Sequence, residues 1–248
     1  MRTYLLTELR RITRNRKVVI LTAAYPTVLY LIFGTSFDDG SLQDGVSVKS
    51  YLMVSMALFG ATGAALAVSG VISAEREAGW TRQLRLTPLP GWVYVAAKVG
   101  TAVLSATLAI VMVFVVARAT GAGEVGAGRV VVAALVLFVG MLPFAALGVF
   151  FGYLAIGQAN RPIMMFSWMG LSILGGLWFP LDNLPTAVQD ISKLTPTYQL
   201  ADMSRDALTG AMPTAGGLGV LVGWTVVASV LAAWRFRADT VSATPALA

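Results

Sequence analysis

The sequence predicts an all-α integral membrane protein, a single transmembrane domain over residues 1–248 with six spanning helices. Of the 248 residues, 57% are hydrophobic and only 12% are charged, whereas soluble domains carry about 25% charged residues. Six apolar runs are long enough to cross a bilayer, which takes roughly 20 helical residues. The runs show neither the charged face of a soluble helix nor the alternation of a membrane barrel. They lie near residues 18–36, 51–73, 98–117, 130–154, 162–180 and 214–234.

Residues 1–17 predict an amphipathic helix that lies in the membrane interface before the first span. Leu5, Leu9 and Ile12 follow helical spacing, and arginines occupy much of the remaining surface. A basic tail without regular structure is the alternative. The apolar run that follows is too long for a signal peptide and is interrupted by Pro26, so we expect it to be retained as a helix.

The distribution of basic residues predicts the topology. If the N-terminus is cytoplasmic, the cytoplasmic segments are 1–17, 74–98, 155–161 and 235–248, and they hold most of the 18 Lys and Arg residues. Basic residues are retained on the cytoplasmic side of a membrane. Six spans then place both termini in the cytoplasm. The net charge of +6 is thus explained by basic residues retained on the cytoplasmic side of the lipid bilayer. We therefore expect no nucleic-acid partner.

The six runs contain few groups that could perform chemistry. They hold no Asp, Glu or Arg, and Lys98 lies only at the edge of the third run. Ionisable residues within a membrane mark proton relays and ion sites. The chain also has no Cys, no His and no GxxxxGK[ST] phosphate-binding motif. We therefore expect no catalytic residue, metal site or cofactor in this chain, and expect that energy for uphill transport comes from another protein.

Small residues within the runs predict close helix packing. Gly148 and Gly152 form one GxxxG pattern, and Gly219 and Gly223 form another. Small faces allow helices to approach closely in lipid. The sequence leaves open whether these faces pack within the chain or form a dimer. Pro143, like Pro26, lies inside a run and is expected to kink its helix.

Residues 74–92, AEREAGWTRQLRLTPLPGW, separate the second and third runs. Ser73 could cap a short helix that carries Glu75 and Glu77 in its first turn, next to the positive end of the helix dipole. Pro88 and Pro90 would prevent that helix from continuing. The segment predicts a short, charged, cytoplasmic helix.

Two blocks of sequence resemble the permease subunits of ABC-2 type transporters, in particular bacterial drug and antibiotic exporters. The second block is GGLWFPLDNLPTAVQDISKLTPTYQLADMSRDALTG, between the fifth and sixth runs. Together with the six runs, the resemblance covers nearly the whole chain. The matching residues of the first block are Glu75, Arg76, Glu77, Gly79, Leu84, Leu86, Pro88 and Lys98. Those of the second are Gly175, Gly176, Phe179, Pro180, Leu184, Pro185, Pro196, Tyr198, Arg205 and Gly210.

This resemblance implies an ABC-2 type exporter fold and defined partners. Permeases of the family pair as homodimers or heterodimers with a second copy or a paralogue. Each pair docks two ATP-binding subunits, encoded as separate chains, which bind ATP and Mg. Residues 74–92 would be the coupling helix, which presses into the ATPase. The residues expected at this joint are Glu75, Arg76, Glu77, Gly79 and Arg82. Pairing of these charges with each other or with water is the alternative, because exposed ion pairs stabilise by less than about 1 kcal/mol.

The outward segment 181–213 is expected to form short helices. Val188, Ile191 and Leu194 recur at helical spacing, and Leu200, Met203 and Ala207 do the same further along. Such helices would lie at the outer surface or dip back into the membrane. The resemblance implies that they cap the exit of the transport route, and plain loop helices are the alternative.

The substrate is expected to be a hydrophobic small molecule, such as a drug or antibiotic, or a lipid, exported across the bacterial plasma membrane. A route for apolar molecules is lined by flexible or aromatic side chains, and packed or lipid-facing positions are the alternative for each candidate. The alternative functions are a polysaccharide exporter, a membrane enzyme and a non-transporting immunity or sensory subunit. The candidates for the route are Met53, Met56, Met141, Met165, Phe166 and Trp168.

Overall fold

A computed structural model describes residues 16–36, 47–87, 90–120, 125–181 and 184–241. These residues form helices and no strands, which confirms the predicted all-α class. The predicted interfacial helix falls almost wholly outside the described residues. The helices are α2 (Arg16–Ser36), α3 (Val48–Glu77), α4 (Trp80–Arg85), α5 (Gly91–Ala119), α6 (Ala127–Val139), α7 (Leu142–Leu154), η1 (Gly157–Ala159), α8 (Asn160–Leu174), α9 (Thr186–Lys193), α10 (Pro196–Thr209) and α11 (Ala215–Val241).

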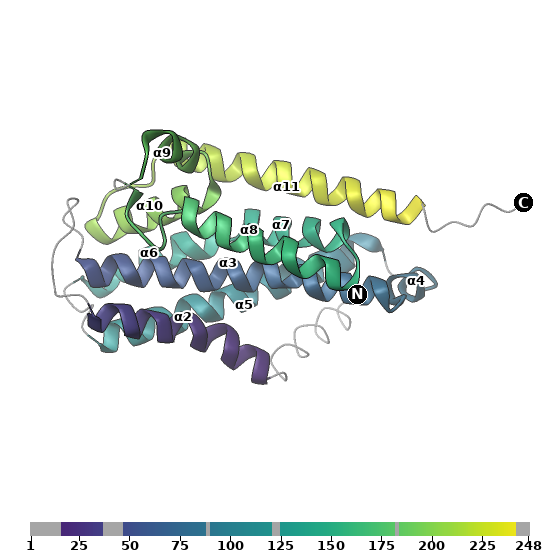
Figure 1. Cartoon of the computed structure of the whole chain (residues 1–248), viewed down its shortest axis with the longest axis horizontal. Coiled ribbons are helices and arrows are strands. Elements are labelled where there is room, and N and C mark those ends of the chain that lie inside the picture. The colour runs from purple at the N-terminus through teal and green to yellow at the C-terminus, as the bar shows by residue number, and fades with distance from the viewer. Residues whose placement is uncertain (1–15, 37–46, 88–89, 121–124, 182–183, 242–248) are drawn as a thin grey trace, which may run out of the picture.

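Helix α3 is the central element of the bundle. It begins where the hydroxyl of Ser47 accepts a hydrogen bond from the Ser50 N–H, and it continues for 30 residues. Within its most apolar stretch, 89% of the residues are buried. It packs against α2, α5, α7, α8 and α10, and it runs along the middle of the molecule in Figure 1. A helix apolar on all sides is surrounded by other helices or by lipid, and α3 is surrounded by other helices.

Four of the six predicted spans are confirmed as segments long and apolar enough to cross a membrane: Val48–Glu77, Gly91–Ala119, Ala127–Leu154 and Ala215–Asp239. The other two runs are helical but are not among these four. Helix α2 has 21 residues, and its apolar sequence begins at Val18 and includes the stretch Thr22–Gly34. Helix α8 has 15 residues, which gives a length of about 22 Å, less than the roughly 30 Å of a bilayer core.

The predicted helix over 162–180 is wrong in its last six residues, 175–180. Helix α8 ends at Leu174, and Gly175 and Gly176 form the turn that follows it. Gly176 has a φ of +63°, a left-handed conformation that only glycine adopts readily. The chain therefore leaves the helix before Phe179 and Pro180.

The fourth run is interrupted. It forms α6 and α7, which are separated at Gly140 and Met141, and Pro143 lies in the first turn of α7. Proline is tolerated there because the first N–H groups of a helix have no intrahelical acceptor. The kink expected at Pro143 is thus a break between two helices, whereas Pro26 lies inside an uninterrupted α2.

Helices α9 and α10 occupy the segment predicted to hold short helices. Thr195 caps α10 by accepting from the Tyr198 N–H, and Gly210 ends it at a φ of +94°. Leu200, Met203 and Ala207, the residues at helical spacing, are buried. Helix α10 packs against α6, α11 and α3, so it dips into the bundle. Figure 1 shows α9 and α10 at one end of the molecule and α4 at the other; we call these the α10 end and the α4 end.

The two GxxxG patterns have different environments. A Cβ added to Gly148 would lie 2.5 Å from the Ala65 carbonyl oxygen, and one added to Gly152 would lie 2.7 Å from the Ile72 Cβ. This pattern therefore packs α7 against α3 within the chain. A Cβ added to Gly219 or Gly223 would have no described neighbour within 4 Å.

We expect Gly148→Val to destabilise the protein by about 1–3 kcal/mol, because the new side chain must displace the backbone of α3. Gly219→Val is the matched control, since it introduces the same side chain into a helix at an open position. Thermal unfolding in detergent measures both. Equal unfolding temperatures for the two variants would contradict the packing of α7 on α3.

Candidate functional site at the α3–α4 junction

Helix α3 ends in a turn centred on Gly79, which has a φ of +71°. The N–H groups of Ala78 and Gly79 donate to the carbonyls of Ala74 and Arg76 at 2.9 and 3.1 Å. Such a left-handed residue stops a helix and redirects the chain. The predicted helix over 74–92 is therefore two elements, the last turn of α3 and the short α4. The prediction that Ser73 caps a helix here is wrong, because Ser73 lies inside α3.

Helix α4 protrudes from the bundle in Figure 1. Trp80 at its start is 42% exposed, and Leu86 just after its end is 89% exposed. The chain then enters α5 through Pro90, whose fixed φ suits the position before a helix. The protrusion thus presents two large apolar side chains on a short element held between two long helices.

Glu75 is turned into the bundle. The Lys98 ammonium donates to Glu75 Oε1 at 2.6 Å, and the Tyr94 hydroxyl donates to Oε2 at 2.7 Å. Lys98 is completely buried and Glu75 almost so. Charges are stable in such surroundings only when they are paired and hydrogen-bonded. These contacts tie the end of α3 to the start of α5.

Arg76 points to a different side of α3. Its guanidinium forms an ion pair with Asp239 near the end of α11 and donates to the Gly152 carbonyl of α7 at 3.1 Å. It also lies over the Tyr153 ring, with 5.2 Å between the guanidinium carbon and the ring centroid. We call Glu75, Arg76, Tyr94, Lys98 and Asp239 the junction cluster.

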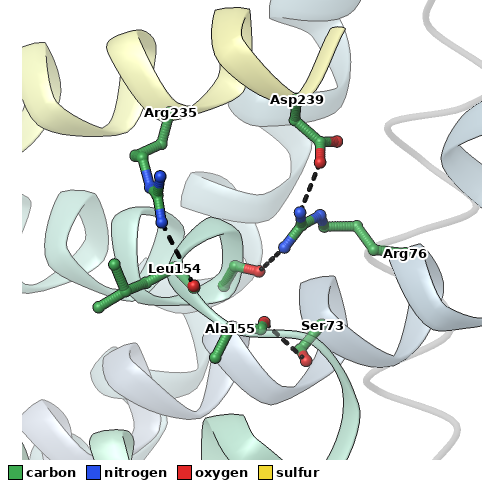
Figure 2. Close-up of polar contacts among 7 residues, drawn as sticks. Ser73, Arg76, Leu154, Ala155, Arg235 and Asp239 are labelled. Atoms are coloured by element: carbon green, nitrogen blue, oxygen red, sulfur yellow. Dashed lines mark hydrogen bonds and ion pairs between the residues drawn. The ribbon is translucent and has the colours of Figure 1, made fainter. Parts of the chain in front are cut away.

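The last carbonyls of α7 accept hydrogen bonds from two other helices (Figure 2). The final carbonyls of a helix have no intrahelical donor. Besides the bond from Arg76, Ser73 donates to the Ala155 carbonyl at 3.1 Å, and Arg235 of α11 donates to the Leu154 carbonyl at 3.4 Å. The end of α7 is therefore held by side chains of α3 and α11.

A buried amide adds α8 to the same end of α3. Ser69 donates to the Asn160 side-chain oxygen at 3.0 Å, and the Asn160 amide donates to the Phe151 carbonyl at 2.7 Å. Asn160 is the first residue of α8 and is buried. The last three turns of α3 thus contact α5, α7, α8 and α11 through polar groups.

The structure separates the five residues predicted at the ATPase joint. Glu75 and Arg76 face into the bundle and do not pair with each other. The partner of Glu75 belongs to α5, and that of Arg76 belongs to α11. Glu77 is exposed at the last position of α3, and Gly79 forms the turn. Arg82 belongs to α4, and its side chain is not among those described. Their role in docking stays a prediction.

Three members of the junction cluster were not predicted to belong to a site. Lys98 was named at the edge of a run and as a family-matching residue but without a partner, and Tyr94 and Asp239 were given no role. The available signal was the burial of Lys98 within apolar residues, since a lysine in such a place requires an acidic partner. Glu75 and Glu77 are the acids that precede it most closely along the chain, and the structure pairs it with Glu75.

The candidates for a substrate route differ in their surroundings. Met53, Met56 and Met141 are fully buried in the core. Trp168 stacks on Phe59, with 4.5 Å between ring centroids, and donates to the Phe59 carbonyl. Met165 and Phe166 lie exposed on α8. Met53, Met56, Met141 and Trp168 are therefore packed in this conformation, and the role of all six in a substrate route stays a prediction.

A groove of about 690 Å³ follows the α4 half of α3. Its size falls in the range of pockets for drug-sized ligands, roughly 300–1,000 Å³. Small apolar residues form its floor, and Trp80 of α4 forms its end. The lining residues are Ala67, Gly70, Val71, Ala74, Glu75, Ala78 and Trp80.

We expect Lys98→Met to destabilise the protein by about 3–5 kcal/mol, because it leaves the Glu75 carboxylate buried without its ion pair. Glu75→Gln/Lys98→Met should recover most of that loss, since the amide still accepts from Tyr94 and no charge is buried. Lys193→Met, which removes an exposed pair with Asp190, should change stability by less than about 1 kcal/mol. Thermal unfolding in detergent measures all three. A double variant less stable than Lys98→Met would contradict this assignment.

Comparisons with known proteins cover the junction and most of the bundle. A family model described as ABC-2 family transporter protein matches residues 35–234. The chain is 25% identical over 232 residues to the Bacillus subtilis (strain 168) protein named "Putative transport permease YvfS", which covers 93% of this chain and 94% of that protein. Together with the apolar helices, these matches show a multi-pass membrane protein of the permease type, and the chain belongs to the ABC-2 family of transporter proteins.

Proposed function

We propose that this chain is the transmembrane subunit of an ATP-driven exporter in a bacterial cell membrane. Two ATP-binding subunits dock at the α4 end of a permease pair. These subunits, and not the permease, bind Mg and hydrolyse ATP. The permease carries a hydrophobic small molecule or a lipid out of the cell. Membership of the ABC-2 family, whose permeases work with ABC ATP-binding subunits, supports this assignment.

One observation carries the proposal: α4 is attached to helix ends that are tied to the rest of the bundle. The residues directly before α4 contact α5 through Glu75 and contact α7 and α11 through Arg76. A displacement of α4 would therefore act directly on helices from both halves of the chain. A short surface helix without such ties would move alone.

The surface of α4 suits protein docking. Trp80 and Leu86 are large, exposed and close together along the chain, and tryptophan is among the residues that most often dominate binding energies. Glu77 adds an exposed negative charge beside them. The ATP-binding subunit would bury these apolar groups in a cleft and meet Glu77 with a basic group at its rim.

The proposed topology counts α2 and α8 among six spans and places the interfacial helix and both termini in the cytoplasm. Arg161, Arg235 and Arg237 lie toward the α4 end, as cytoplasmic basic residues should. The shortness of α8 is compatible with a span because the turn and α9 continue the segment toward the α10 end.

The groove beside α3 supports an apolar substrate. It has the volume of a site for a drug-sized molecule, and its walls are mostly aliphatic. Met165 and Phe166 of α8 are exposed on the bundle surface, where a second permease, identical or paralogous, would cover them. In this arrangement the pair of permeases encloses the route that one chain leaves open.

Reconstitution tests the function. The chain and its cognate ATP-binding subunit, purified together, should accumulate a hydrophobic dye or a fluorescent phospholipid in inside-out vesicles only when ATP is present. Transport at full rate without nucleotide would contradict the proposal. Association with the ATP-binding subunit but no transport of any such probe would instead favour the non-transporting role.

We expect Leu86→Asp to weaken binding of the ATP-binding subunit at least tenfold, because a charge replaces an apolar contact and tenfold corresponds to about 1.4 kcal/mol. Met212→Asp is the matched control: Met212 is 86% exposed at the α10 end. Co-purification from detergent extracts, quantified against the wild type, measures both variants. Equal losses for the two would show that α4 is not the docking element.

A further inference from the structure

Two ion pairs leave α3 from consecutive residues and reach different helices. The inner pair is Glu75–Lys98, and the outer pair is Arg76–Asp239. Consecutive residues of an α-helix point about 100° apart, so the two pairs lie on different sides of α3. One joins α3 to α5, and the other joins α3 to α11.

The inner pair is built to stay closed. The Lys98 side chain is 0% exposed and that of Glu75 is 10% exposed, and the Tyr94 hydroxyl occupies the second carboxylate oxygen. Separating the charges would leave both in apolar surroundings, which is strongly unfavourable. Helices α3 and α5 also pack closely on each other. Because α4 connects these two helices, α3, α4 and α5 are held as one unit.

The outer pair is less enclosed. The Arg76 side chain is 8% exposed, but that of Asp239 is 26% exposed, so water can solvate the carboxylate when the pair opens. The Nε atoms of Arg76 and Arg235 are buried and meet no acceptor among the described residues. An unsatisfied buried donor destabilises the arrangement that contains it. The hydrogen bonding on this side of the junction is therefore incomplete.

In the described part of the chain, helix α11 packs little against α3 itself, although Phe236 near its end lies against Tyr153 of α7 and Gly91 of α5. Only 22% of its most apolar stretch is buried. It packs mainly against α7 and α10, and the described part of the chain shows no comparable packing between α11 and α3. Figure 2 shows Arg76 reaching across to Asp239 near the end of α11. The polar contact, rather than apolar packing, joins the two helices here.

We propose that the outer pair opens during the transport cycle while the inner pair stays closed. The end of α11 then separates from the unit of α3, α4 and α5, while α7 stays packed on α3 through Gly148 and Gly152. Arg76 and Asp239 are positioning residues: they hold α11 to α3 in the resting state and release it when α4 is displaced. This inference rests on the proposed function, because the ATP-binding subunit supplies the displacement.

Cysteine cross-linking tests the difference between the pairs, since the chain contains no cysteine of its own. The two variants are Arg76→Cys/Asp239→Cys and Glu75→Cys/Lys98→Cys, each in complex with the ATP-binding subunit and treated with a short bifunctional thiol reagent. We expect a non-hydrolysable ATP analogue to slow cross-linking of the outer pair at least fivefold and to leave the inner pair unchanged. Cross-linking the outer pair should also stop ATP-dependent dye transport, whereas cross-linking the inner pair should not.

The outcomes separate this inference from the proposed function. Loss of co-purification of the wild-type complex would contradict the proposed function. Intact co-purification with the same nucleotide response at both pairs, or with none at the outer pair, would overturn the inference alone. A milder variant covers the case in which a cysteine pair fails to fold. Asp239→Asn should lower the amount of dye transported per ATP hydrolysed at least threefold, and Asp239→Glu should retain it. A purely structural role would leave that ratio equal in the two variants.

Discussion

The burial of the Lys98 ammonium against the Glu75 carboxylate is the interaction on which the α4 end of this protein depends. Removing either charge from water is costly, so each group is stable at its position only because the other is there. That mutual requirement fixes how the end of α3 lies along the start of α5. The connection between them, with α4 inside it, is then anchored at both ends. The exposed apolar groups of α4 therefore sit on a short element whose ends are anchored and whose Leu84 packs against the core.

Close packing determines the rest of the bundle around α3. Gly148 and Gly152 bring α7 against the backbone of α3, and Gly63 leaves room for the Trp168 ring. In a membrane, contacts of this kind replace the hydrophobic effect, because lipid chains are as apolar as the side chains they would leave. The central helix is consequently surrounded on nearly all sides. The exception is its groove near α4, which is also where the polar ties are concentrated.

Apolar runs were sufficient to predict the class and the approximate places of the helices, because length and hydropathy decide both. The directions of Glu75 and Arg76 could not be predicted, since their partners lie far along the chain and the rotation of α3 follows from packing. Helix α3 continues to Glu77, so both residues belong to it and not to the short helix in which they were expected. The end of α8 at Leu174 is associated with the left-handed backbone of Gly176. A pair of glycines in an apolar run does not by itself predict a turn. The docking residues and the substrate route stay predictions.

The way α7 ends has a consequence for how the protein is assembled in the membrane. Its last carbonyls carry no glycine cap and find their donors on Ser73, Arg76 and Arg235. Two of these residues precede α7 in the chain, but Arg235 follows it by some eighty residues. Until α11 has been synthesised, the Leu154 carbonyl therefore lacks the donor that Arg235 supplies in the folded protein. A chain truncated before α11 would leave the end of α7 with incomplete hydrogen bonding.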